Sequence, residues 1–257
     1  MAIIIKTPEQ IETLRVGGKR LARILDAVAS HVRPGMSAKE LDIFAEKLIY
    51  DEGDEPAFKN YKPSHHSAPY PASLIVSINS EVVHGIPKEN KILKEGDIVS
   101  LDLGIKHKGL FTDHAVTIPV GNISKADQEL LTVTHNALMA GIESIVPNKT
   151  TTGDVGVVIA SFAKKAKYGI VRELAGHGVG VYIHEDPFIP NYGKKGNGDV
   201  FVPGMVVAIE PMFNRGRDAI VVDKDGYTVR TADGSRSAHF EHTILITETG
   251  VEIPTKK

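Results

Sequence analysis

DIVSLDLGIKHKGLFTDHAVTIPV, residues 97–120, is the stretch that decides the fold class and directs the search for a functional site. Its two halves, 97–105 and 110–120, are rich in apolar and β-branched residues, and a short polar segment with one glycine separates them. This pattern predicts two antiparallel strands joined as a hairpin. Each strand carries one acid in an otherwise apolar setting, Asp102 and Asp113.

A turn centred on His107 and Lys108 would place Asp102 directly opposite Asp113. Like charges in that position repel each other, and burial adds to the cost. Two interpretations follow. Either a positively charged group lies between the acids, or one or both of them point to solvent from a half-exposed sheet. The hairpin alone leaves both open.

The rest of the chain predicts helix pairs that are followed by strands. A capping box at Thr7 begins a helix over 8–31, and a second one at Ser37 begins a helix that runs to about Asp51. An irregular loop over 54–72 then leads to a strand at 73–79. The pattern then restarts, since Ser124 caps a helix to about Ile145 and Thr152 caps another to about Lys167. This weak internal duplication relates 7–120 to 124–253 and favours one compact α+β unit.

Composition excludes several classes of protein. The 257 residues are 42% hydrophobic and 24% charged with a net charge of −2, as in a soluble globular protein and unlike an electrostatic nucleic-acid binder. With no cysteine, a disulfide scaffold and thiolate ligation are excluded, so a metal would need His, Asp or Glu ligands. No segment resembles a signal peptide or a membrane span, and we expect a cytoplasmic protein.

Two further acids lie in apolar, strand-like segments. Glu210 is in MVVAIEP (205–211) and Glu241 is in SAHFEHTILI (237–246). A single acid in a strand usually lies on its solvent-exposed face. Four such acids, with a histidine in a glycine-rich turn, form the oxygen-rich ligand set that a pair of divalent ions prefers, with carboxylates available to bridge them.

That histidine belongs to LAGHGVGVYIHEDP, residues 174–187, where His177 and His184 are seven positions apart. A regular strand would put them on opposite faces, whereas glycine permits an irregular backbone that brings both to one cleft. His84 follows the strand-like segment 81–83 and could face the same cleft, although a lone histidine is more often structural. His107 and His31 are predicted to face solvent, and His65 and His66 receive no role.

These motifs, in this order, resemble the type I (bacterial-type) methionine aminopeptidases from about Ile5 to Ile253. The matching segments are VVHGIP (82–87), SLDLG with FTDHAV, GHGVG with HEDP (176–187), VVAIEPM (206–212) and SAHFEHTI (237–244). The resemblance implies the pita-bread fold, an α+β architecture in which helices cover a curved antiparallel sheet. Residues 1–257 would form a single catalytic domain with pseudo-symmetric halves of about 5–121 and 122–253.

The resemblance also implies a metal centre with two divalent ions, drawn from Co, Mn, Fe or Zn. The implied ligands are Asp102, Asp113, His177, Glu210 and Glu241. Asp113 and Glu241 would bridge both ions, Asp102 would complete one site, and His177 with Glu210 would complete the other. A hydroxide activated by both metals would attack the scissile carbonyl, with Glu210 as the proton acceptor. The same match allows a monovalent cation near Asn79 and Ser237.

The implied activity is hydrolytic removal of the N-terminal methionine from nascent proteins whose second residue is small. His84 and His184 would contact the scissile peptide and support its transition state. The expected partners are peptides that begin with methionine and nascent chains, with a transient ribosome contact allowed. No direct nucleic-acid or membrane binding is expected, and the chain is expected to be monomeric.

The residues matched to the methionine pocket depart from the family pattern at three of four positions. Tyr70 agrees, whereas Ile75 stands where cysteine is common, Ile183 where an aromatic residue is common, and Tyr227 where tryptophan is common. A more aliphatic pocket could still accept the flexible thioether of methionine. The loop 58–70 is longer than in many relatives.

Three alternatives are weighed against this interpretation. An X-Pro peptidase of the same fold usually has an additional N-terminal domain, whereas the pattern here begins at about residue 5. A binding protein that kept the fold but lost the chemistry usually lacks ligands, and all five are present. GHGVGV (176–181) has a faint similarity to a dinucleotide-binding loop, but no helix pattern follows it.

Overall fold

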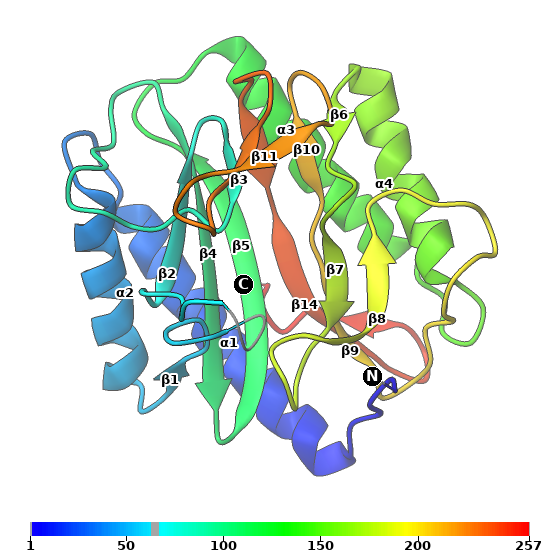
Figure 1. Ribbon diagram of the computed structural model, residues 1–257. Helices are drawn as coiled ribbons and strands as arrows, with labels where there is room; N and C mark the ends of the chain where they lie inside the picture. The colour runs from blue at the N-terminus through cyan, green and yellow to red at the C-terminus, as the bar shows by residue number, and fades with distance from the viewer. Residues whose placement is uncertain (1, 63–66, 257) are drawn as a thin grey trace.

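The computed structural model describes residues 2–62 and 67–256. Within these residues a nine-stranded antiparallel sheet forms the centre of the α+β fold (Figure 1). Along its main path the sheet contains β1 (Glu55–Pro56), β4 (Ile98–His107), β5 (Leu110–Pro119), β14 (Glu241–Ile246), β9 (Val206–Ile209), β7 (Ala175–Gly178) and β8 (Glu185–Pro190). Two further strands pair at its side, β2 (Leu74–Ile78) with β4 and β15 (Val251–Glu252) with β14.

Two small sheets, each of three strands within the described residues, adjoin the central one. The first contains β13 (Ser237–His239), β10 (Met212–Asn214) and β6 (Gly169–Ile170). The second contains β11 (Ile220–Val222), β12 (Val229–Thr231) and β3 (Glu81–Val83). The second sheet joins β3 to the β11–β12 hairpin, which comes more than 130 residues later in the chain.

The four predicted helices are present close to their predicted bounds. They are α1 (Pro8–His31), α2 (Ala38–Asp51), α3 (Lys125–Glu143) and α4 (Thr152–Ala166). The capping boxes at Thr7 and Ser37 are confirmed. The prediction that Thr152 caps α4 is wrong by one residue, because the hydroxyl of Thr151 accepts a hydrogen bond from Asp154 N.

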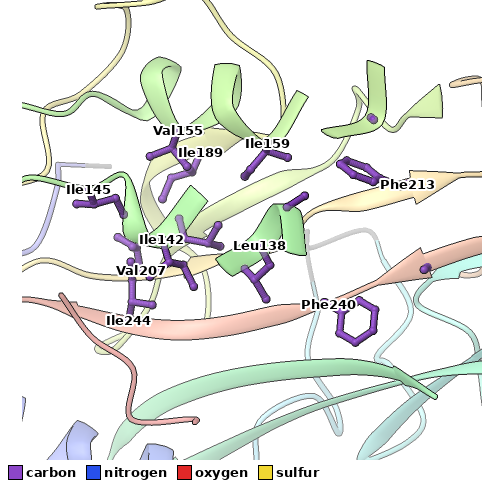
Figure 2. Packing of buried hydrophobic residues seen from close by; sticks show 14 of the residues in the cluster. Leu138, Ile142, Ile145, Val155, Ile159, Ile189, Val207, Phe213, Phe240 and Ile244 are labelled. Atoms are coloured by element: carbon purple, nitrogen blue, oxygen red, sulfur yellow. The ribbon is translucent and has the colours of Figure 1, made fainter. Parts of the chain in front are cut away.

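Each helix pair covers one half of the sheet, and in Figure 1 α1 passes behind β4 and β5. Leu21 and Leu41 of the first pair belong to the same buried cluster as Leu101 of β4. In the other half, side chains of α3 and α4 pack against β8, β9 and β14, as Figure 2 shows for Leu138, Ile159 and Val207 among others. Burial of each such side chain contributes about 1.5–3 kcal/mol. The opposite face of the sheet is therefore left for the site.

The hairpin forms as predicted, but its register differs. The turn residues are Lys108 and Gly109, both with positive φ (47° and 86°), as tight hairpin turns require. Asp102 therefore pairs with Ala115, and Asp113 pairs with Gly104. The predicted direct pairing of the two acids is wrong, and they are diagonal neighbours on one face. They are 6% and 3% exposed, which excludes the solvent-facing alternative.

The prediction that His107 faces solvent is also wrong. Strand β4 extends to His107, whose Nδ1 lies 2.6 Å from Asp54 Oδ1 in a buried pair. Helix α1 covers this tip, where Gly17 leaves room for the His107 side chain. His31 is half-buried, with its ring 4.6 Å from that of Phe44. In the part of the chain that is described, no helix has the length and apolarity needed to cross a membrane.

Candidate metal centre and substrate cavity

Strand pairing gathers the predicted acids on one face of the central sheet, which we call the front face and define by Asp102 and Glu241. Ala115 on β5 pairs with both of these residues, so the two carboxylates lie on either side of a small methyl group. Directly paired residues share a face of an antiparallel sheet. Glu210 follows β9, whose last residue pairs with the neighbour of Glu241.

A second row of residues crosses the same face. His177 pairs with Ala208, and Ala208 pairs with Thr243. The Thr243 hydroxyl joins this row to β5, because it accepts a hydrogen bond from Asp113 N at 2.9 Å and donates one to Asp113 O at 2.7 Å. Among the described residues, Asp113, His177 and Glu241 each offer a ligand atom within 4.8 Å of the others.

Without a cation between them, the four buried carboxyl groups disfavour one another's ionised form. Burial raises the pKa of Asp102, Glu210 and Glu241 well above their ordinary values, and the nearby Asp113 raises all three further. Burial raises the pKa of Asp113 as well. Asp102 Oδ1 and Glu241 Oε1 are buried without a hydrogen-bond partner in the described part of the chain. Divalent cations would relieve both the repulsion and the missing partners, so this donor set fits a metal centre.

His177 has the tautomer that a metal ligand needs. Its Nδ1–H donates to Gly178 O at 2.8 Å, which leaves the Nε2 lone pair facing the acids, 3.4 Å from Glu210 Oε1. Burial lowers the pKa of His177 to about 4, so the ring is uncharged at neutral pH. The register of β7 and β8 shifts between His177 and Gly178, and a Cβ on Gly178 would come within 2.2 Å of Asp186 O.

That irregular backbone brings the two histidines of the 174–187 segment together, as predicted. The rings of His177 and His184 are 4.5 Å apart and roughly perpendicular. His184 Nδ1 lies 2.8 Å from the hydroxyl oxygen of Tyr61. Burial, and then the neighbouring His177, lower the pKa of His184.

His84 reaches the same site from the end of β3. It follows β3 with a φ of 59°, and its side chain lines the same cavity as His184. Burial lowers the pKa of His84 to about 4, with a smaller contribution from His184. Two uncharged imidazoles therefore face the space above the acids.

A buried ion pair holds the turn that carries His184. Lys6 Nζ contacts Glu185 Oε2, and both side chains are almost fully buried. Glu185 Oε1 accepts a second hydrogen bond from Tyr182 N at 2.8 Å. The N-terminal segment is thereby fastened to the loop between β7 and β8, beside His184.

The acids and histidines lie in a cavity of about 610 Å³. Its apolar lining includes three of the predicted pocket residues, Tyr70, Ile75 and Tyr227, and also Phe58. The rings of Tyr70 and Tyr227 meet edge to face at 5.1 Å. Ile183 is buried in the surrounding apolar cluster and is not among the residues that line the cavity.

The long loop at the rim of the cavity has a fixed base. Asn60 N donates to Tyr70 O and Tyr70 N donates to Tyr61 O, each at 2.8 Å. The Tyr227 hydroxyl donates to Ala68 O and ties the returning side of the loop to the β11–β12 hairpin. His65 and His66 lie outside the described residues.

Sequence reasoning missed two residues of this site. Tyr61 gave no signal, because it lies in an irregular loop and meets His184 only through the fold. His239 is buried, with its Nε2 3.6 Å from Glu210 Oε2 and 4.0 Å from Glu241 Oε2. Its signal was available in SAHFEHTI, since it precedes Glu241 by two positions and period-two alternation puts both on one face.

Comparison with known proteins agrees with this geometry. The sequence pattern of metallopeptidase family M24 matches residues 12–248. Methionine aminopeptidase 1 of Bacillus subtilis is 43% identical over 254 residues, with 99% of each chain covered. The crystal structure of methionine aminopeptidase from Thermotoga maritima superposes with a TM-score of 0.95 at 44% identity, with 100% of each chain covered. A prolidase from Pyrococcus furiosus superposes with a TM-score of 0.79 at 26% identity. That match covers 99% of this chain and 66% of the prolidase chain. The expected α+β pita-bread fold is confirmed.

Proposed function

The chain belongs to metallopeptidase family M24, and we propose that it removes the N-terminal methionine from polypeptides whose second residue is small. One observation carries the proposal: five potential ligands converge beneath an apolar cavity in a chain that matches methionine aminopeptidases over its full length. The acids would lie at the reacting peptide bond, and the apolar wall would receive the methionine side chain.

The residues that would hold two divalent cations are Asp102, Asp113, His177, Glu210 and Glu241. The assignment is supported by two buried carboxylate oxygens, on Asp102 and Glu241, that have no hydrogen-bond partner among residues 2–62 and 67–256. When bound, the cations supply Lewis acidity and make water a strong enough acid to yield hydroxide near neutral pH. Four carboxylates and one imidazole suit Co, Mn, Fe or Zn, so metal availability decides among these ions.

Glu210 would act as the proton acceptor during attack on the scissile carbonyl. Its side chain is 12% exposed and lines the cavity, with Oε1 3.4 Å from His177 Nε2. A carboxylate that lines the cavity can take a proton from the attacking water and then pass it to the leaving amine.

His184 would donate a hydrogen bond to the scissile carbonyl oxygen. The Tyr61 hydroxyl is protonated at neutral pH, and we assign it as the donor to His184 Nδ1, which lies 2.8 Å away. The proton of the neutral imidazole then lies on Nε2, where it can support the developing negative charge. His84 supplies a second uncharged imidazole to the same cavity.

Tyr70, Ile75 and Tyr227 would contact the methionine side chain. The Tyr70 hydroxyl donates to Gly85 O at 3.1 Å, so the polar end of the ring is already satisfied and its face remains for the thioether. Ile183 would act one layer behind these residues by supporting the wall.

The remaining assignments follow from the same match. We propose a single catalytic domain over 1–257, supported by the two helix-covered halves that share one sheet. A cytoplasmic monomer acting on nascent chains, with a transient ribosome contact, fits this activity. A monovalent cation is proposed near Asn79 and Ser237, where Asn79 O accepts a hydrogen bond from Ser237 N at 2.8 Å.

The test is release of methionine from the tripeptide Met-Ala-Ser by protein loaded separately with Co²⁺ and Mn²⁺. Methionine release is expected, together with little or no cleavage of Gly-Pro. Metal-loaded protein that releases no methionine would overturn the proposal. Turnover of Gly-Pro in place of Met-Ala-Ser would instead assign the chain to the X-Pro peptidases that share this fold.

A further inference from the structure

His239 is a buried histidine to which the hydrolysis described above gives no role. Its side chain is 1% exposed, and neither ring nitrogen has a hydrogen-bond partner among the described residues. A buried polar group without a partner costs about 1–3 kcal/mol, so each such group needs an explanation.

The position of this ring is set by a well-bonded backbone. His239 N donates to Thr117 Oγ1 at 2.8 Å, and the same hydroxyl donates to His239 O at 2.7 Å. On its other side, β13 pairs with β10, where His239 lies opposite Met212. The ring is therefore directed toward the acids by two neighbouring strands.

The two oxygens of Glu210 face different histidines. Oε1 lies 3.4 Å from His177 Nε2, and Oε2 lies 3.6 Å from His239 Nε2. His177 presents a lone pair toward Oε1, because its proton is on Nδ1. A cation between His177 and Glu210 would use that side, which leaves Oε2 for a hydrogen-bond donor.

We propose that His239 is a positioning residue for Glu210: its Nε2–H donates to Glu210 Oε2 and holds Oε1 in the orientation that binds a cation. The inference rests on the proposed metal centre. A hydrogen bond requires about 2.7–3.2 Å between nitrogen and oxygen, so a small rotation of the carboxylate is enough to form it.

Direct ligation by His239 fits the structure less well. The five proposed ligands all line the cavity, whereas His239 is not among its lining residues in the described part of the chain. Residues that orient a metal ligand by hydrogen bonding commonly change metal affinity by about 10- to 100-fold when they are removed.

The experiment compares His239→Leu with His239→Gln by calorimetric titration of metal-free protein with Mn²⁺. Leucine removes the donor, whereas the glutamine amide can still donate to Glu210. We expect His239→Leu to weaken Mn²⁺ binding about 10- to 100-fold and His239→Gln to stay within about threefold of the unmodified protein. His135→Leu is the matched control, since His135 is an exposed histidine on α3 that packs against Phe240, and its removal should leave Mn²⁺ affinity unchanged.

Loss of an unpaired buried imidazole should not unfold the protein, which thermal unfolding of the metal-free variants checks. If His239→Leu does not fold, His239→Met removes the donor with a more flexible side chain. Unchanged Mn²⁺ affinity in the folded variant would overturn the inference. Equal losses in the leucine and glutamine variants would also overturn it, because they indicate direct ligation.

This readout is separate from peptide hydrolysis. If the unmodified protein binds Mn²⁺ but releases no methionine, the proposed function fails and the role of His239 can still be measured. If the unmodified protein binds no Mn²⁺, the metal centre itself is wrong and both proposals fail.

Discussion

Strands β5 and β14 carry acids on one face and imidazoles on the other, and the two faces differ in how their polar atoms are satisfied. On the front face, buried oxygens of Asp102 and Glu241 have no hydrogen-bond partner within the described residues. On the back face, which carries His114 and His242, the rings stack at 4.6 Å. His114 Nδ1 donates to Glu241 O, and His242 Nδ1 contacts a hydroxyl oxygen at 2.9 Å.

Burial does not account for this difference, since all four side chains are less than 9% exposed. A sheet selected for stability alone would satisfy both faces, as it does at His114 and His242. The front face instead keeps a concentration of repelling acids. Buried acids that repel one another are expected where a protein binds a ligand at the cost of local stability. Among the ionisable side chains of the two faces, paired groups therefore indicate structure and unpaired ones indicate a ligand site; the buried Thr112 hydroxyl on the back face also has no partner within the described residues, but it carries no charge.

The largest effect should come from removing a front-face acid. Asp102→Ala and Glu210→Ala should each lower kcat for Met-Ala-Ser by at least about a thousand-fold, roughly 4 kcal/mol, because charge stabilisation at the reacting carbonyl is lost. Steady-state kinetics at saturating Mn²⁺ measures this. Full activity in either variant would contradict the ligand assignment.

The isosteric variant Asp102→Asn separates chemistry from folding. The pKa of Asp102 is raised in the folded protein, so its ionisation opposes folding as the pH rises above its unfolded value of 3.8. At pH 7.5, metal-free Asp102→Asn should melt at or above the temperature of the unmodified metal-free protein while remaining inactive. A clearly lower melting temperature would indicate that Asp102 is a structural residue.

The contrast between the two faces also marks the limit of sequence reasoning. The apolar and β-branched composition of 97–120 identified the strands and, with the family resemblance, a set of acids that the fold does bring together. It missed the register by two residues, since Asp102 pairs with Ala115 rather than Asp113, because Lys108 adopts a positive φ beside Gly109 and moves the turn by one position. A glycine at the end of the polar segment was the available signal.

Contacts between segments that are distant in the sequence could not be predicted from local sequence patterns. His107 was predicted to face solvent because hairpin tips usually do, but α1 covers this tip and Asp54 bonds to the ring. Tyr61 meets His184 across 123 positions of sequence. Such meetings depend on tertiary packing, which neither hydrophobic periodicity nor capping signals describe.

A buried acid that does have a partner supplies the next test. Glu185 is paired with Lys6, and both side chains are buried. Lys6→Met would leave Glu185 buried and unpaired, like the front-face acids but without a cation to relieve it. We expect the free energy of unfolding to fall by about 3 kcal/mol, measured by urea denaturation. The double variant Lys6→Met/Glu185→Gln should recover much of this loss, and an unchanged stability of Lys6→Met would show that the pair contributes little.

The back-face imidazoles should appear in the pH dependence of stability. Burial lowers the pKa of His114 to about 4 from an ordinary value of 6.5, so between these values the unfolded chain binds the extra proton. Stability is therefore lost as the pH falls from about 6.5 toward 4. In metal-free protein, His114→Gln should reduce the slope of the unfolding free energy against pH by up to about 1.4 kcal/mol per pH unit, the value for one bound proton. Urea denaturation at several pH values measures the slope, and identical slopes would contradict the prediction.

The smallest effect should come from Tyr61, which tests whether the front-face imidazole needs the kind of partner that His114 has on the back face. Tyr61→Phe keeps the ring but removes the hydroxyl that lies 2.8 Å from His184 Nδ1, so the proton is no longer directed to Nε2. The loss falls on the transition state rather than on methionine binding. We expect kcat to fall about tenfold, roughly 1.4 kcal/mol, with KM nearly unchanged.

Tyr70→Phe is the matched control, because its hydroxyl donates to Gly85 O in the same cavity without touching a catalytic imidazole. Equal losses of kcat in the two variants would mean that Tyr61 acts only as part of the wall, whereas a loss confined to Tyr61→Phe would show that His184, like His114 and His177, is fixed through Nδ1.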